Sequence, residues 1–93
     1  MPLSKNARQA LINGLGSPYA GDKVADIVDA GTGTVDDGTR RRIIVAFGNR
    51  KVATTFITKL QTSAALSGIE RRHLSNAIGS QGLANEIATA LAQ

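Results

Sequence analysis

The sequence predicts an all-α fold of three tandem helical hairpins, six short helices in all, stacked as a small repeat array. Three observations lead to this prediction. Apolar residues between positions 66 and 91 recur at helical spacing, a glycine divides that segment in two, and the same pattern occurs twice more upstream. Internal repetition with a period of roughly 20–50 residues is typical of stacked supersecondary units.

The clearest unit is the last one, residues 66–92. Ser67 is a favourable N-cap residue, and Glu70 three positions later completes the pattern of a capping box. Gly79 can adopt the left-handed conformation that ends a helix, and Ser80 directly after it can cap a second helix. The apolar residues that follow share one helical face: Leu83, Ala84, Ile87, Ala88 and Leu91. This unit is therefore expected to be two short helices joined at a glycine.

The same pattern divides residues 1–93 into a single domain of three repeats: 3–30, 35–61 and 66–92. The glycines at the helix elbows align at intervals of 32 and 31 residues: Gly16, Gly48 and Gly79. The caps of the first helices also align: Ser4, Asp36 and Ser67. One arginine recurs in each unit: Arg8, Arg40 and Arg71. So many matched positions favour three copies of one hairpin.

The middle unit allows a second interpretation. Its β-branched runs, Arg42–Phe47 and Val52–Ile57, flank a Gly-Asn dipeptide, which is typical of a β-hairpin. The aligned segments of the other two units are poor strands and good helices. Because propensity is a weak guide when the context contradicts it, the repeat favours helices here as well.

Composition limits how stable the isolated chain can be. The 93 residues include ten glycines and no cysteine, and the apolar residues are mostly small and aliphatic. Such a core buries little area per residue, and no disulfide can reinforce it, so packing against partners or against copies of itself is expected to add stability. The start, Met1–Ser4, lacks the apolar segment of a signal peptide, and no run is long enough to span a membrane.

No arrangement of residues predicts catalysis, a metal site or a cofactor. Asp36 and Asp37 stand where acids belong at a helix start, and His73, the single histidine, has neither cysteine nor an acid cluster beside it. The pairs Gly14-x-Gly16 and Gly31-x-Gly33 lack the lysine and the third glycine of phosphate-binding loops. The serines have no base spaced to activate them. We therefore expect no enzyme, no cofactor and no small-molecule substrate.

The basic residues are the best candidates for contact with a partner. The formal net charge is +4, and the middle unit alone carries six positive side chains. Five basic residues are assigned to a partner-binding surface: Arg41, Arg42, Arg50, Lys51 and Arg72. For the first four, which do not recur as a set, a plain solvated face is the equal alternative. The repeated arginines Arg8, Arg40 and Arg71 are instead expected to hold the stack together, for example by pairing with an acid of the neighbouring unit.

The Leu-Ser start, the repeated arginine, the glycine elbow and the short helix from Ser80 to Ala88 resemble small Ala/Gly-rich helical repeats in virion proteins of tailed bacteriophages. The resemblance implies a structural, non-enzymatic subunit such as a capsid decoration (cement) protein or a connector, made in the host cytoplasm and located in the virion. Its partners would be other capsid or connector subunits, and copies of itself. The alternative is a small basic nucleic-acid-binding accessory protein that uses the same arginines on phosphates.

Overall fold

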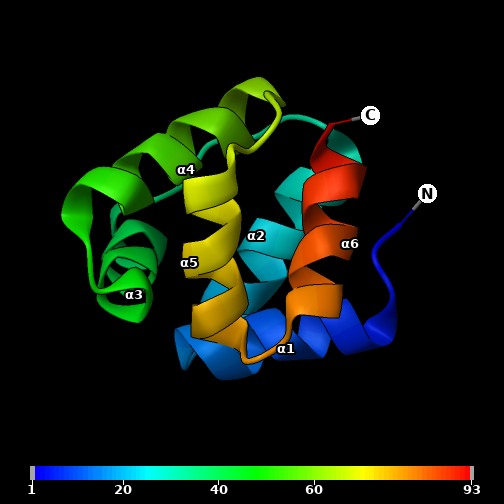
Figure 1. Cartoon of the computed structure of the whole chain (residues 1–93), viewed down its shortest axis with the longest axis horizontal. Helices are drawn as coiled ribbons and strands as arrows, with labels where there is room; N and C mark the ends of the chain where they lie inside the picture. Colours follow the sequence, from blue (N-terminus) through cyan, green and yellow to red (C-terminus); the bar gives the residue numbers. More distant parts are fainter. Residues whose placement is uncertain (1, 93) are drawn as a thin grey trace.

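Six helices, joined in consecutive pairs, make up the computed structural model, which describes residues 2–92 (Figure 1). Their bounds are α1 Lys5–Leu15, α2 Pro18–Ala30, α3 Asp37–Phe47, α4 Arg50–Thr62, α5 Gly68–Ile78 and α6 Gln81–Leu91. The prediction of an all-α fold with six short helices in three hairpins is confirmed. The β-branched segments of the middle unit lie in α3 and α4, so the β-hairpin interpretation is wrong.

Short-range hydrogen bonds from the predicted cap residues begin the helices. In five helices the N-cap side chain accepts the backbone N–H three residues later; these caps are Ser4, Ser17, Asp36, Asn49 and Ser80. At α5 the Glu70 carboxylate accepts the backbone N–H of Ser67 at 2.9 Å and its hydroxyl at 2.6 Å. Because these bonds satisfy donors that the first turn leaves free, each helix begins at a position that local sequence defines.

The ends of the helices depend on left-handed residues. Gly16, Gly48 and Gly79 have φ values of 69°, 67° and 72°, and each precedes the N-cap of the next helix. Gly31 ends α2 in the same conformation, with φ of 75°, and Ser63 ends α4 with φ of 53°. The segment after α4 is therefore a linker and does not continue the helix.

The apolar positions that recur in the repeats form one core. Those that are buried include Leu11, Leu15, Val24, Val28, Ile43, Phe47, Phe56, Leu60, Leu74, Ile87 and Leu91. Phe47 and Phe56 pack within the middle hairpin, with ring centroids 5.0 Å apart and planes tilted by 47°. Most of the remaining buried side chains are aliphatic, so the elements are held by close contact between small groups.

The three hairpins close on themselves. Each hairpin packs on the next, as predicted, and α5 and α6 also pack against α1, so the last hairpin contacts the first (Figure 1). The principal extents of 28, 24 and 23 Å are nearly equal, which fits a closed group better than an open stack. Gly14 permits this closure because it has no side chain. A Cβ at this position would lie 2.6 Å from the carbonyl oxygen of Ala77 in α5.

Replacing Gly14 with alanine tests this closure. Alanine normally improves a helix, yet here its Cβ would push α1 away from the α5 backbone, and we expect a loss of about 1–3 kcal/mol in the free energy of unfolding. Gly82→Ala is the matched control, because its Cβ would make only an ordinary contact with the Ser80 hydroxyl at 4.0 Å and should stabilise α6 by about 0.5 kcal/mol. Urea unfolding measures both; equal, favourable effects would contradict the closure.

The elbows give a second prediction. Gly48 and Gly79 have left-handed φ values but no neighbour within 4 Å of an added Cβ, so Gly48→Ala and Gly79→Ala report backbone strain alone. Each should lower the free energy of unfolding by about 1 kcal/mol, the cost of a left-handed residue that carries a Cβ. Equal losses by thermal or urea unfolding would show that the two elbows are equivalent, and no loss at one of them would show that its conformation can relax.

Candidate interaction surface

Arg8, on α1, is held by three carboxylates of α2. Its guanidinium lies 3.0 Å from Asp22, 3.0 Å from Asp26 and 3.2 Å from Asp29. Hydrogen bonds to Asp22 and Asp26 raise the pKa of Arg8. All three acids belong to the same hairpin as the arginine. Arg8 therefore joins the two helices of one unit, and in the described part of the chain the expected pairing with an acid of the neighbouring unit is not found.

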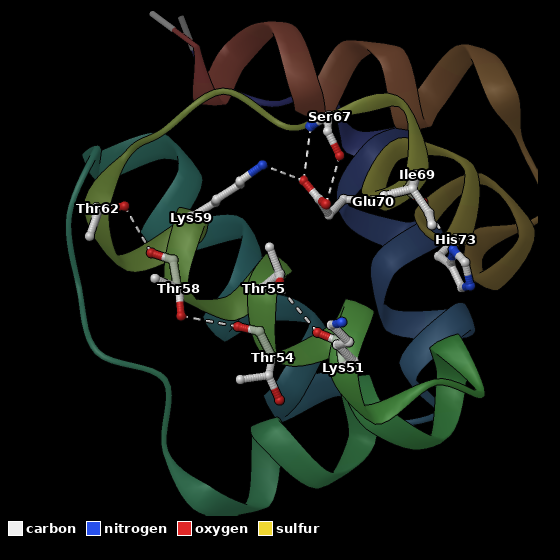
Figure 2. Close-up of polar contacts among 10 residues, drawn as sticks. All are labelled: Lys51, Thr54, Thr55, Thr58, Lys59, Thr62, Ser67, Ile69, Glu70 and His73. Carbon is white, nitrogen blue, oxygen red and sulfur yellow. Dashed lines mark hydrogen bonds and ion pairs between the residues drawn. The ribbon is translucent and has the colours of Figure 1, made fainter.

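The other two repeated arginines lack these acids. Around Arg40 the aligned positions are occupied by Thr54, Thr58 and Gln61, and around Arg71 by Asn85, Thr89 and Ala92. In α4 the Thr58 hydroxyl donates to the Thr54 carbonyl oxygen at 3.1 Å, within its own helix (Figure 2). Within residues 2–92 neither Arg40 nor Arg71 forms an ion pair. The repeat-stacking role assigned to these two arginines thus stays a prediction without an ion pair to support it.

The closest ion pair between hairpins joins Lys59 of α4 to Glu70 of α5. The ammonium nitrogen lies 2.6 Å from the carboxylate, which also accepts the Ser67 hydrogen bonds (Figure 2). Glu70 is only 4% exposed. Burial raises the pKa of Glu70, but the hydrogen bonds from Lys59 and Ser67 outweigh burial and hold it below the ordinary value. The sequence indicated the capping role of Glu70, whereas no local signal pointed to Lys59.

Two further polar contacts hold neighbouring hairpins together. Glu86 of α6 accepts the backbone N–H of Ser4 at 2.8 Å and its hydroxyl at 2.9 Å, which joins the last hairpin to the first. Arg42 of α3 donates to the carbonyl oxygen of Gly16 at 3.0 Å, which joins the second hairpin to the first elbow. One of the predicted partner-binding arginines is therefore also part of the packing between hairpins.

A shallow hollow lies on the surface where α3 meets the end of α1. Arg41, Arg42 and Val45 line it together with Gly14 and Gly16, and its volume is about 410 Å³. Val45 is 79% exposed, the largest value among the exposed large apolar side chains. The sequence predicted both arginines as partner-binding residues, whereas Val45 was not predicted. The signal was present, because the aligned positions in the other hairpins are asparagines.

The other predicted surface residues lie elsewhere. Arg50 and Lys51 are exposed in the first turn of α4, beyond the elbow that ends α3. Arg72 lines a separate hollow of about 640 Å³ between α5 and α6, together with Arg71. The structure thus groups Arg41 with Arg42 and places Arg72 beside Arg71.

The remaining candidates from the sequence have structural contacts. His73 packs on Phe47, with ring centroids 6.0 Å apart, and its Nδ1 lies 2.9 Å from the carbonyl oxygen of Ile69. Asp36 caps α3, and hydrogen bonds from Thr39 hold the pKa of Asp36 below its ordinary value. Each of these side chains therefore has a role within the fold.

Among residues 2–92, no helix is both long and apolar enough to cross a membrane, and no three potential metal-ligating side chains are grouped. Comparison with models of protein families, with curated protein sequences and with solved structures gives no match for this chain. The fold and the two basic hollows are therefore the evidence from which a function can be inferred.

The Lys59–Glu70 pair predicts how stability depends on pH. The pKa of Glu70 in the folded protein lies below that of an unfolded glutamate, about 4.3. The ionised carboxylate therefore stabilises the fold above about pH 4.3, and this stabilisation is lost as pH falls through the folded pKa. Glu70→Gln should lower the free energy of unfolding by about 1–3 kcal/mol near neutral pH and by less at about pH 3.

Urea unfolding at both pH values measures this effect. Asp37→Asn, an exposed acid in the first turn of α3, is the matched control and should change stability much less at either pH. Asp36 keeps its own lowered pKa, so some acid sensitivity remains in the Glu70 variant. If Glu70→Gln loses as much stability between neutral pH and about pH 3 as the wild type does, the ion pair contributes nothing to the pH dependence of stability.

Proposed function

We propose that this protein is a structural, protein-binding subunit that docks through the face of α3. The observation that carries this proposal is Val45, which is 79% exposed and stands beside Arg41 and Arg42 over a shallow hollow. Protein interfaces commonly combine an apolar centre with a polar rim, and arginine is enriched in them. A partner with an apolar side chain bordered by acids would be complementary to this face.

The geometry of the face supports recognition of a specific partner. Arg41 and Val45 are one turn apart on α3, so their side chains are neighbours on the helix surface. Arg42 is oriented by its bond to the Gly16 carbonyl oxygen, and its guanidinium retains further N–H donors for a partner carboxylate. Because α1 and α3 both line the hollow, its shape depends on the packing of two hairpins.

The resemblance to small helical-repeat virion proteins suggests the setting. A small chain with an exposed docking face and basic charge would suit a capsid decoration (cement) protein or a connector. It would be made in the host cytoplasm and would bind other subunits of a tailed-phage particle. We infer an acidic patch on the partner subunit, because the middle hairpin, with six basic and two acidic side chains, carries all of the excess positive charge.

Nucleic-acid binding is the second candidate, and the six positive side chains of the middle unit favour it. Against it, Phe47 and Phe56 are buried in the core and cannot stack on bases, which leaves Tyr19 as the exposed ring of the described chain. Duplex binding should also weaken steeply between about 50 and 200 mM salt, whereas a contact with an apolar centre should persist.

Incorporation into particles tests the preferred function. Arg41→Glu and Val45→Asp, introduced into the genome that encodes the chain, should each reduce the amount of chain in gradient-purified particles by about tenfold or more, because each places an acid opposite an apolar or acidic partner. Quantitative mass spectrometry of the particles measures the effect. Lys5→Glu, an exposed charge reversal on α1, is the matched control and should be incorporated normally.

Two outcomes would overturn the proposal. One is a wild-type chain that is missing from purified particles. The other is steeply salt-dependent binding of the purified chain to duplex DNA that Arg41→Glu weakens, which would favour the second candidate. Circular dichroism of each variant confirms that a loss of incorporation does not reflect unfolding, since exposed charges contribute little to stability.

A further inference from the structure

The hollow between α5 and α6 has the composition of an anion-binding surface. Its polar lining consists of Arg71, Arg72, Ser75, Asn76, Gln81 and Asn85, and its volume is about 640 Å³. Both arginines are exposed, and among residues 2–92 no acid lines the hollow. The guanidinium groups, the amides and the hydroxyl all provide donors, so the hollow favours carboxylate oxygens.

The last hairpin lacks the carboxylates that surround the equivalent arginine in the first hairpin. Arg71 aligns with Arg8, whose guanidinium binds three aspartates of the facing helix. In the last hairpin those acids are replaced by the neutral residues Asn85, Thr89 and Ala92. The last hairpin therefore keeps the arginine of this arrangement without its carboxylates.

The way the two helices pack also differs between these hairpins. In the first hairpin Ile12 lies so close to Gly21 that an added Cβ there would be 2.5 Å away. In the last hairpin Ser75 aligns with Ile12, and this smaller polar side chain lines the hollow. The replacement puts a hydroxyl in place of an apolar side chain, so the surface beside Arg71 is more polar at this position than the one beside Arg8.

The complementary surface occurs on the same chain. Three carboxylates on α2 share the single guanidinium of Arg8, which leaves negative charge in excess. The side chains of Asp22 and Asp26 are 51% and 68% exposed, so both can accept a second cationic partner. They lie one turn apart on α2 and therefore present two carboxylates side by side.

We propose that the hollow of Arg71 and Arg72 binds the acidic face of α2 from a second copy of this chain. Asp22 and Asp26 of one molecule would form ion pairs with Arg71 and Arg72 of another molecule. These pairs would resemble those that α2 forms with Arg8 within one molecule. The two surfaces differ and lie on different hairpins, so the association is heterologous and produces a ring or a filament. It uses neither Val45 nor Arg41, and it stands independently of the function proposed above.

Salt and concentration govern such a contact. Ion pairs between exposed side chains are individually weak and are screened by salt, so association should need high protein concentration and low ionic strength.

Sedimentation velocity of the purified chain, over a range of concentrations at low and at high salt, tests the proposal. The wild type should associate at low salt and dissociate as salt rises. Arg71→Glu/Arg72→Glu should stay monomeric. Lys5→Glu, a charge reversal at an exposed residue of α1 that does not line the hollow, is the control and should associate like the wild type.

A charge exchange makes the test specific. Asp22→Lys/Asp26→Lys should also be monomeric alone, and its mixture with Arg71→Glu/Arg72→Glu should associate again, because opposite charges then face each other. Asp26→Lys alone replaces the double variant if circular dichroism shows that loss of the Arg8 contacts unfolds the chain.

A wild type that stays monomeric at every concentration would overturn the proposal, as would self-association that survives Arg71→Glu/Arg72→Glu. Binding of duplex DNA that only the Arg71→Glu/Arg72→Glu variant loses, without self-association of the wild type, would assign the hollow to nucleic acid instead. Arg41→Glu should leave self-association unchanged, so a failure here is distinguishable from a failure of the proposed docking face on α3.

Discussion

The fold depends first on a backbone constraint, the left-handed glycine that ends the first helix of each hairpin. At Gly16, Gly48 and Gly79 the chain leaves one helix and enters the cap of the next within two residues. So short a connection forces the two helices against each other along their apolar faces. Each hairpin thereby becomes a unit with one apolar side to bury, and three such units can bury it only against one another.

Some charged side chains hold the fold together, and others are exposed on the surface. Arg8, Lys59 and Arg42 contact acids or a carbonyl oxygen, within a hairpin or between hairpins. Arg41 and Arg72 are exposed beside hollows. The same repeat position can belong to either group, because the neighbouring acids present in one hairpin are replaced by neutral residues in another. Divergence among the hairpins thus leaves an exposed arginine at a repeat position that forms ion pairs in another hairpin.

Much of the fold was predictable because its signals are local. A cap such as Ser67 acts within three residues, and a left-handed elbow such as Gly79 acts within one turn. The middle hairpin was the difficult case, since its β-branched residues favour strands, and comparison with the other two units correctly predicted helices. Less of the candidate interaction surface was predictable. Arg41, Arg42 and Arg72 were assigned to it from the sequence, and that assignment stays a prediction. The exposure of Val45 beside Arg41 and Arg42, and the separation of Arg72 from them, were not predicted.

The sequence by itself determined the number, type and limits of the helices, because caps, elbows and apolar periodicity are properties of residues close together in the chain. Only the tertiary structure decided how the hairpins meet. The approach of Gly14 to Ala77 and the pairing of Lys59 with Glu70 join residues on different hairpins, and neither leaves a pattern within a single helix. Such contacts depend on the shapes of both packed surfaces. Capping residues and apolar periodicity describe one helix at a time and therefore do not predict them.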